Sequence, residues 1–489
     1  NNAPIFEVEG RSFPVELRYR PVSEMSIVGS DDDEFDDFEE NLPRAVVQAV
    51  EECFRDAQEK GHPEYADTLI FASTEQEIRE LQETLQKHGP RHTEILPLYA
   101  RLALAEQQKI FNPSGGGRRI IIATNVAETA LTVPNIRYVI DSGFARISRY
   151  NYRSRVQRLP IEAVSQAAAN QRKGRCGRIA PGVCIRLYSE EDFQSRPEFT
   201  EPEIKRTNLA SVILQMQSLG LGALEDFDFI EPPDHRLVND GRKLLVELGA
   251  MTEKSKAPLL QRGGGGDSSE VNPPQSPFSK GGSKGDLTKI GQQMAKMPID
   301  PRLARMILGG AHFGVLNEVL VIVAALAVQD PRERPADKQM QADQKHALFR
   351  EADSDFLFYI KLWEALVANR DMSENKRRTF ARNHFLSWLR LREWKKTHEQ
   401  LVDLAKGLKL SFNEKKASYE NLHRALLTGL LSFIANKTDE RNVFMAVRQQ
   451  KARIFPASTL HKTNTPWVMA FEMVETSQVY ICLLYTSDA

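Results

Sequence analysis

Eight residues from Gln171 to Arg178, QRKGRCGR, bring together three arginines, one lysine and two glycines in a 489-residue chain whose formal net charge is −1. The alanine-rich stretch before them favours a helix. If that helix continues to Arg178, then Gln171, Arg175 and Arg178 share one face, because residues three and four apart are neighbours on a helix. Guanidinium groups form paired hydrogen bonds to phosphate oxygens. The spacing therefore predicts a phosphate-binding face, with a solvated basic helix end as the alternative.

Two glycines in the same stretch, Gly174 and Gly177, lie three residues apart. Because glycine has no side chain, another backbone or a ligand can approach both positions closely, at some cost in helix propensity. We therefore count Gly174 among the candidate ligand-binding residues.

A second group of arginines, between Arg146 and Arg158, is interleaved with Tyr150 and Tyr152. This pattern suits a nucleic-acid strand, since arginines pair with phosphates and aromatic rings stack on bases. An ordinary charged hairpin is the alternative. The candidate nucleic-acid contacts are Arg149, Arg153, Arg155 and Arg158, together with the basic residues Arg448, Lys451 and Arg453 near the carboxyl end.

The composition excludes several classes of protein. The hydrophobic share of 41% and the charged share of 27% are typical of a globular protein. Four cysteines, without a C-x-x-C pair or a nearby histidine cluster, argue against a zinc site or a disulfide framework and for a reducing, cytoplasmic compartment. No apolar run approaches the roughly 18 residues that a membrane span needs. We expect no metal site in this chain and no membrane contact.

One motif is absent from the sequence. The loop that cradles nucleotide phosphates, G-x-x-x-x-G-K-[ST], does not occur in the 489 residues, and neither does D-E-A-H. Any nucleotide site on this chain therefore lacks the usual phosphate loop.

Between residues 63 and 188, short apolar runs rich in β-formers alternate with helical patterns. This alternation predicts a parallel sheet covered by helices on both faces, with ligands at the carboxyl ends of the strands. Thr124 and Asp141 would lie at those ends. The predicted strands are residues 67–73, 93–99, 118–124, 137–143 and 182–188.

The remaining segments differ in character. We interpret the acidic run Asp31–Glu40 as a solvated surface insert. Between Lys254 and Asp286, Gly, Pro and Ser make up 17 of 33 residues, which predicts a disordered insertion. The pattern is helical before and after that insertion, and short alternating runs follow residue 441, which favours a small antiparallel barrel. The last residues, YICLLYTSDA, break the alternation, so we expect a truncated barrel and a non-native tail at 481–489.

The motifs resemble those of a known family. QRKGRCGR is similar to motif VI of superfamily-two helicases, whose form in the DEAH/RHA group is Q-R-x-G-R-x-G-R, and all six fixed positions match. ATNVAETALTVPNIRYVIDSGF at 123–144 resembles motif V of this group, and TLIFASTEQEI at 68–78 resembles motif IV. The resemblance covers nearly the whole chain. The chain departs from the family at Ala130, where motif V usually has serine.

The resemblance implies an α/β plus α plus small β fold: a RecA-like parallel-sheet motor domain, a winged helix, a helical bundle and a partial OB-like barrel. The implied divisions are the end of the first motor domain or linker at 1–22, the second RecA-like domain at 23–196, the winged helix at 197–253, the insertion at 254–286, the helical bundle at 287–425, the barrel at 426–480 and the tail at 481–489.

The resemblance also implies roles in an ATP site. Gln171, Arg175 and Arg178 would face the γ-phosphate of ATP, with Arg178 as the arginine finger. Phe111 would stack on adenine, with a buried core phenylalanine as the alternative. ATP would bind with Mg²⁺, whose ligands we expect in the first motor domain, because the opening residues resemble the family's join between its two motor domains.

Other implied roles concern RNA. Thr124 and Thr132 match positions of motif V that hydrogen-bond RNA phosphates, and Asn125 lies between the RNA and ATP functions. We also count Asn125 and Thr132 as candidates on the ATP side. The arginine-rich segment between motifs V and VI would be a β-hairpin that wedges between bases as a duplex parts. A ribosome or an accessory protein is a further candidate partner, although no residue identifies one.

Two functions follow from these observations. The first is part of an ATP-dependent RNA helicase, inactive alone because one half of its ATP site is missing. The alternative is a stand-alone nucleic-acid-binding or regulatory module without ATPase activity.

Overall fold

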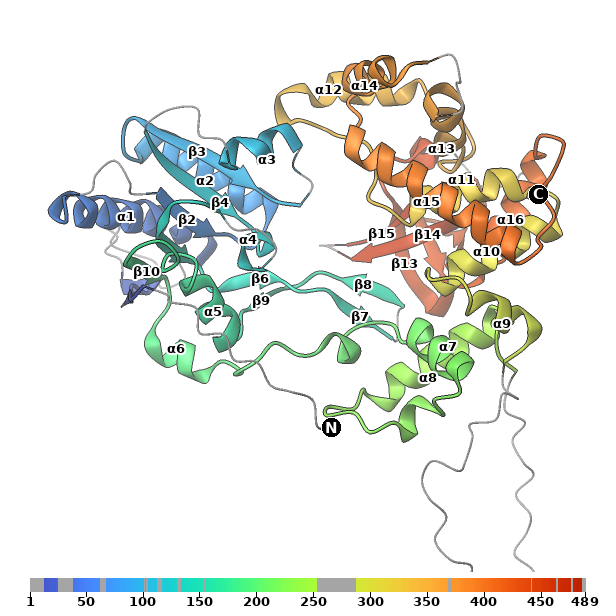
Figure 1. Cartoon of the computed structure of the whole chain (residues 1–489), viewed down its shortest axis with the longest axis horizontal. Helices are drawn as coiled ribbons and strands as arrows, with labels where there is room; N and C mark the ends of the chain where they lie inside the picture. Colours follow the sequence, from blue (N-terminus) through green and yellow to red (C-terminus); the bar gives the residue numbers. More distant parts are fainter. Residues whose placement is uncertain are drawn as a thin grey trace, which may run out of the picture. The chain divides into compact units, whose positions relative to one another are not determined.

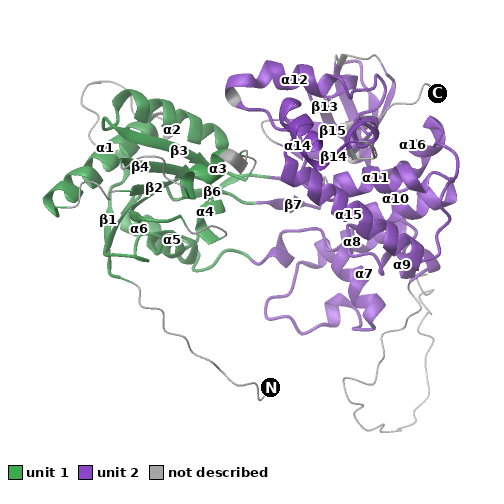
Figure 2. Ribbon diagram, turned by 45° about the horizontal axis from the view of Figure 1, so that its top comes forward, with its two compact units in different colours: residues 1–147, 159–201 green, residues 148–158, 202–489 purple. Residues whose placement is uncertain are grey.

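The computed structural model describes residues 13–24, 38–61, 67–100, 102, 104–111, 117–129, 133–152, 155–252, 287–367, 372–440, 442–462, 465–475 and 478–485. They form two compact units (Figure 1; Figure 2): a sheet unit, residues 1–147 and 159–201, and a carboxyl-terminal unit, residues 148–158 and 202–489. The insertion expected at 254–286 and residues 31–37 of the acidic run lie outside the described residues.

The sheet unit is built on a parallel sheet, as the alternating pattern predicts. Its strand order is β1-β10-β5-β2-β4-β3, and all neighbouring strands pair in parallel. The five predicted strands are confirmed, and β1 adds an edge strand from residues that we had expected in the linker at 1–22. The bounds are β1 Val15–Tyr19, β2 Asp67–Phe71, β3 Thr93–Leu98, β4 Arg118–Ala123, β5 Ile136–Asp141 and β10 Gly182–Arg186.

Helices cover both faces of this sheet. Two helices, α1 and α2, share a hydrophobic core with one set of alternating strand residues, whereas α3 and α4 pack with the other set. Strand residues with alternate side-chain directions thus serve two cores, which is why these strands read as continuous apolar runs. The helices of this unit are α1 Phe38–Glu59, α2 Glu75–His88, α3 Leu104–Phe111, α4 Val126–Thr129, α5 Gln166–Lys173 and α6 Glu190–Ser195. A two-stranded ribbon pairs β6 Phe144–Arg146 with β9 Ile161–Ala163.

A buried ion pair lies at the amino-terminal ends of β2 and β4. Arg119 donates from Nε and Nη2 to Asp67 Oδ2 at 3.0 and 2.6 Å, and its backbone N–H donates to Asp67 Oδ1 at 2.9 Å. Its Nη1 donates to the carbonyl of Ile110 at 2.7 Å. The pair therefore joins β2 to β4 and holds the last turn of α3, which ends at Phe111.

The carboxyl-terminal unit begins with helices. The region predicted as a winged helix contains α7 Ala210–Leu219 and α8 His235–Glu247, and an antiparallel bridge pairs Met251 with Leu287. The bundle that follows consists of α9 Lys289–Met294, α10 Pro301–His312, α11 Leu316–Leu326, α12 Gln339–Ala347, α13 Leu357–Leu362, α14 Glu374–Asn383, α15 Trp388–Gly407 and α16 Tyr419–Leu427.

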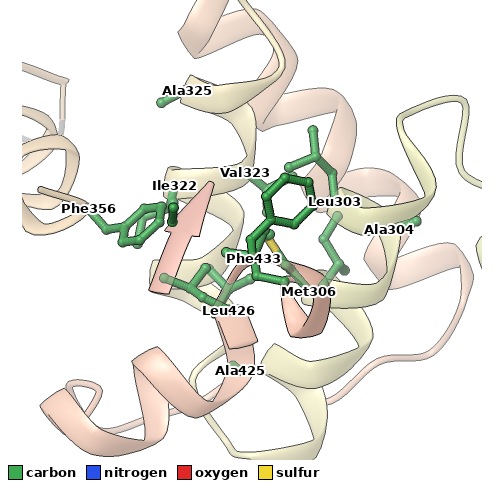
Figure 3. Packing of buried hydrophobic residues seen from close by; sticks show 14 of the residues in the cluster. Leu303, Ala304, Met306, Ile322, Val323, Ala325, Phe356, Ala425, Leu426 and Phe433 are labelled. Atoms are coloured by element: carbon green, nitrogen blue, oxygen red, sulfur yellow. The ribbon is translucent and has the colours of Figure 1, made fainter. Parts of the chain in front are cut away.

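One hydrophobic core runs through this unit. Helices α10, α11 and α16 contribute fully buried side chains, and residues of the adjoining barrel belong to the same cluster. Trp394 is wholly buried and donates its indole N–H to the carbonyl of Val321 at 3.0 Å. Figure 3 shows the close packing of Leu303, Met306, Ile322, Val323, Leu426 and Phe433.

The barrel follows the bundle and is closed within the described residues. Its strand order is β11-β12-β13-β15-β14, and β11 also pairs with β14. Only β13 and β15 pair in parallel, at Arg453–Tyr480 and Ile454–Ile481. The expectation of a truncated barrel is therefore wrong, because the closing pair forms. The strands are β11 Ile434–Lys437, β12 Val443–Ala446, β13 Gln450–Ile454, β14 Trp467–Glu475 and β15 Val479–Tyr485.

The end of the chain joins this barrel through residue 485. Cys482, Leu484 and Tyr485 pair with β14, although we had expected residues 481–489 to lie outside the native sequence. Residues 486–489 lie outside the described residues.

The buried ion pair in the sheet generates a prediction about stability. Asp67→Ala leaves the Arg119 guanidinium buried without its carboxylate, which should lower the free energy of unfolding of the sheet unit by about 3–5 kcal/mol. Urea unfolding followed by far-UV circular dichroism measures the loss. All four tryptophans lie in the carboxyl-terminal unit, so tryptophan fluorescence follows that unit separately.

The matched control is Glu106→Ala, which removes the exposed partner of Lys109. It should cost less than about 1 kcal/mol, because exposed ion pairs contribute little. Equal effects of the two substitutions would contradict the structural role of the Asp67–Arg119 pair.

Candidate nucleotide and nucleic-acid sites

The helix before the arginine-rich turn is shorter than predicted. Ser165 caps α5 by accepting the backbone N–H of Ala168 at 3.2 Å, and the helix ends at Lys173. The prediction that the helix continues to Arg178 is wrong, and with it the argument that three residues share a helical face. The close approach of Phe13, whose N–H donates to the carbonyl of Gly177 at 2.8 Å, gives this stretch another partner.

Arg172 holds the end of α5 in place. Its side chain is fully buried and donates to Asp141 Oδ1 at 2.7 Å and to Glu128 Oε2 at 3.0 Å, while its guanidinium lies 4.8 Å from the centre of the Phe71 ring. Burial alone would lower the pKa of Arg172, but the charges of Asp141 and Glu128 raise it above its ordinary value. The residue therefore stays charged and ties α5 to the carboxyl ends of β2 and β5 and to α4.

Sequence reasoning missed this role. It assigned Gln171, Arg175 and Arg178 to the phosphate-binding face and gave Arg172 no role. Asp141 was the available signal, because it ends an apolar strand and a buried carboxylate needs a cation or several donors. The hydroxyl of Tyr188 also donates to Asp141, at 3.0 Å.

The turn after α5 places two arginines beside each other. Arg175 is 8% exposed and donates from Nη2 to the carbonyl of Glu128, whereas Arg178 and Gln171 are exposed. Burial lowers the pKa of Arg175, and the positive charge of Arg178 lowers it further. Two neighbouring cations, one of them largely desolvated, favour an anionic ligand at this turn.

Motif V lies next to this turn. Thr124 follows β4, is half-buried and donates its backbone N–H to the carbonyl of Leu98 at 3.1 Å. Asn125 is exposed and its carbonyl accepts the N–H of Glu128 at 3.0 Å. Thr132 and Ala130 lie outside the described residues. Because Glu128 binds both Arg172 and Arg175, the structure joins motifs V and VI directly.

Phe111 lies at the end of α3 and is 39% exposed. The alternative of a buried core phenylalanine is therefore wrong. Arg119 holds the carbonyl of the preceding residue, Ile110. An exposed ring on a fixed helix end has the freedom to stack on a flat ligand.

The hairpin of the second arginine group pairs β7 Arg149–Asn151 with β8 Val156–Arg158 and belongs to the carboxyl-terminal unit. Arg149 is half-buried, Arg158 is 45% exposed and donates to Glu475 at 2.7 Å, and Arg153 lies outside the described residues. Arg155 differs from our expectation, because its side chain is 8% exposed and lies between Asp240 and Glu247. We therefore no longer place Arg155 among the RNA contacts.

The barrel carries the remaining candidates. Lys451 and Arg453 are exposed on β13, and Lys451 forms an ion pair with the exposed Glu440. Arg448 lies in the 3₁₀ turn Val447–Gln449. In OB-type barrels the second and third strands form the usual oligonucleotide-binding face, and β13 is the third strand here.

No cluster of three or more His, Cys, Asp or Glu residues able to hold a metal ion occurs among the described residues. No helix of the described parts is long and apolar enough to cross a membrane.

Comparison with known families agrees with this architecture. The helicase conserved C-terminal domain matches residues 47–180, the ratchet-like helicase associated domain (HA2) matches 300–387, and the oligonucleotide/oligosaccharide-binding (OB) fold matches 422–485. The chain belongs to the DEAH/RHA group of helicases and carries the carboxyl-terminal helicase domain together with the associated domains.

Within that group the sequence is similar to helicases named HrpA. It is 50% identical over 481 residues to the ATP-dependent RNA helicase HrpA homolog of Haemophilus influenzae and 49% identical to ATP-dependent RNA helicase HrpA of Escherichia coli. It is 30% identical over 489 residues to the human probable ATP-dependent RNA helicase DHX35. Each match covers 98% of this chain, but only 34% of the two HrpA relatives and 62% of DHX35. The chain thus spans about a third of the length of its HrpA relatives.

Solved structures show the same fold. The crystal structure of the E. coli DExH-box NTPase HrpB has a TM-score of 0.66 and 22% identity, with 98% of this chain and 47% of that chain covered. A second structure of E. coli HrpB gives a TM-score of 0.65 at 22% identity, with 98% of this chain and 48% of that chain covered.

The two glycines of the turn generate a prediction with an internal control. A Cβ at Gly177 would lie 2.7 Å from Val15 Cγ2 and 2.8 Å from the carbonyl oxygen of Phe13, whereas one at Gly174 would lie 3.4 Å or more from its nearest neighbours. Gly177→Ala should therefore destabilise the sheet unit by about 1–3 kcal/mol, through overpacking against backbone. Gly174→Ala should change stability by less than about 1 kcal/mol.

Urea unfolding followed by far-UV circular dichroism compares the two variants. A Gly174→Ala variant that loses as much stability as Gly177→Ala would show that backbone contact with Phe13 does not explain the glycine in this turn.

Proposed function

We propose that this chain supplies one side of the ATP site and the RNA-holding surfaces of an ATP-dependent RNA helicase. The observation that carries the proposal is the turn after α5, where Arg175 and Arg178 lie beside each other next to motif V. The printed names of the HrpA relatives, which are ATP-dependent RNA helicases, support it.

On the ATP side, Arg178 is the arginine finger, and Arg175 and Gln171 contact the γ-phosphate. Positive charge at this point stabilises the charge that develops on the phosphoryl group during hydrolysis. Phe111 stacks on adenine, and Asn125, Thr132 and Gly174 line the nucleotide. The phosphate loop and the ligands of Mg²⁺ must come from another domain, because G-x-x-x-x-G-K-[ST] does not occur in the 489 residues.

On the RNA side, the proposed contacts are to phosphates and carry no sequence information. They combine the hydroxyl of Thr124 with arginines of the hairpin and cations of the barrel. The residues are Thr124, Arg149, Arg153, Arg158, Arg448, Lys451 and Arg453. Backbone binding of this kind suits an enzyme that moves along RNA of any sequence.

The proposal includes a cytoplasmic location. The four cysteines are free in the structure, and three of them are buried, as suits a reducing compartment.

Arg178 offers a test of the ATP side in the complete protein, which includes the phosphate-loop domain. Arg178→Ala should reduce the kcat of RNA-stimulated ATP hydrolysis by about 10³–10⁵-fold and change nucleotide affinity only a few-fold, because a finger acts in the transition state. Steady-state ATPase assays and equilibrium binding of a labelled nucleotide measure the two effects. Arg55→Ala, at an exposed arginine of α1, is the control and should behave like the wild type.

The 489-residue chain alone should hydrolyse no ATP. Turnover by this chain, or loss of nucleotide affinity equal to the loss of rate in Arg178→Ala, would contradict the assignment.

A second test concerns RNA binding by the 489-residue chain. Affinity for single-stranded RNA should fall steeply with salt, and Arg453→Gln should weaken binding and reduce the slope of log K against log salt by about 1. Fluorescence anisotropy at several salt concentrations measures both. Arg424→Gln on α16, whose partner is Glu420, is the control with an unchanged slope. Binding that does not depend on salt would argue against phosphate contacts.

A further inference from the structure

The β7–β8 hairpin is part of the carboxyl-terminal unit, although the strands on either side of it belong to the sheet unit. Residues 148–158 group with residues 202–489 (Figure 2), whereas β6 and β9 group with the sheet unit. Val156 is fully buried in the hydrophobic core that α7, α8 and the barrel share. The hairpin is therefore packed as an integral element and not as a solvated extension.

Arg155 anchors the hairpin through charge. Its Nε donates to Asp240 Oδ1 at 3.1 Å, and its Nη1 donates to Glu247 Oε2 at 2.7 Å and to Ser432 Oγ. Asp240 and Glu247 lie on α8, and Ser432 precedes β11. One guanidinium thus joins the hairpin, the helical region and the entry to the barrel.

The conformation and charge of Arg155 fit this anchoring role. Its φ is +56°, in the left-handed region that is uncommon for a non-glycine residue. Burial would lower the pKa of Arg155, but the hydrogen bond that it donates to Glu247 and the charge of Asp240 raise it. Two carboxylates and a hydroxyl accept hydrogen bonds from Nε and Nη1 of Arg155.

Further contacts hold both hairpin strands. The hydroxyl of Tyr150 donates to Asp240 Oδ2 at 2.7 Å, and its backbone N–H donates to the carbonyl of Arg206 at 2.8 Å. On the other strand, Gln157 and Arg158 pair in parallel with Val474 and Glu475 of β14. The hairpin therefore extends the sheet of the barrel.

We propose that Arg155 is a positioning residue which, with Asp240 and Glu247, locks the hairpin to the carboxyl-terminal unit, so that the hairpin transmits movement between the ATP-binding sheet unit and the RNA-holding barrel. The coupling part of this inference rests on the proposed function, whereas the anchoring of the hairpin does not. The inference replaces the expectation that Arg155 is an RNA contact.

Hydrogen exchange on the 489-residue chain tests the anchoring without any activity. In the wild type, the amides of 149–152 and 155–158 should exchange slowly. Arg155→Gln should speed their exchange by about tenfold or more, because it leaves Asp240 and Glu247 without their cation. Amides of β2 and β4 should not change.

Two variants keep this test decisive. Glu247→Gln leaves Asp240 paired with Arg155 and should give a smaller acceleration in the same segment, which also covers the case that Arg155→Gln fails to fold. Arg242→Gln is the matched control, because Arg242 lies on the same helix but pairs with Glu225. Fast exchange of the wild-type hairpin, or equal effects of Arg155→Gln and Arg242→Gln, would overturn the anchoring.

Coupling is tested in the complete protein. Arg155→Gln should leave RNA-stimulated ATP hydrolysis within about threefold of the wild type and RNA affinity within about twofold, while duplex unwinding falls about tenfold or more. Arg155→Lys, which keeps the charge, should restore part of the unwinding. Weaker RNA binding with a salt slope reduced by about 1 would instead make Arg155 a phosphate contact and overturn the proposal.

Failure of the proposed function is distinguishable from failure of this inference. A wild-type protein that neither hydrolyses ATP nor unwinds RNA refutes the helicase function, and the exchange experiment still decides whether Arg155 anchors the hairpin.

Discussion

The geometry of the candidate ATP site depends on one buried cation. Arg172 has no access to water, so its charge is tolerated only because Asp141 and Glu128 both contact it. These partners come from the end of β5 and from α4, which fixes the end of α5 relative to both. The start of the turn that follows α5 and leads to Arg178 is therefore fixed in position. The turn has positive charges at Arg175 and Arg178, which favour an anionic ligand there.

The arginines of this chain serve two different purposes. Arg119, Arg155 and Arg172 are buried beside carboxylates, and they join segments that are distant in sequence. Arg158, Arg178 and Arg453 are exposed and can meet a ligand. A motif rich in arginine contains both kinds, so its residue types alone do not tell which side chain binds phosphate. Burial and the position of the nearest carboxylate decide it, because a guanidinium saturated by acidic partners has no donors left for another anion.

Features that depend on local sequence patterns could be predicted, whereas features that depend on distant contacts could not. The five strands of the sheet and its parallel arrangement follow from local periodicity, and the motifs identified the family. The partner of the turn after α5 could not be predicted, because it is Phe13, about 160 residues before Gly177 in the sequence. The role of Arg155 depends on Asp240, 85 residues away, and closure of the barrel depends on pairing between β11 and β14. In each case a tertiary contact overrides a local pattern.

The course of the chain limits how the two units can influence each other. The chain passes between them at 147/148, 158/159 and 201/202, and the first two of these connections enclose the hairpin. On the sheet-unit side the ribbon is paired through β6 and β9, and Ile147 N–H donates to the carbonyl of Pro160 at 3.2 Å. On the other side Arg155, Tyr150 and β14 hold it. The ribbon is held at both ends, so a relative movement of the two units must either bend the ribbon or break a buried ion pair. Breaking such a pair costs about 3–5 kcal/mol. The proposed coupling role of the hairpin depends on these two sets of contacts.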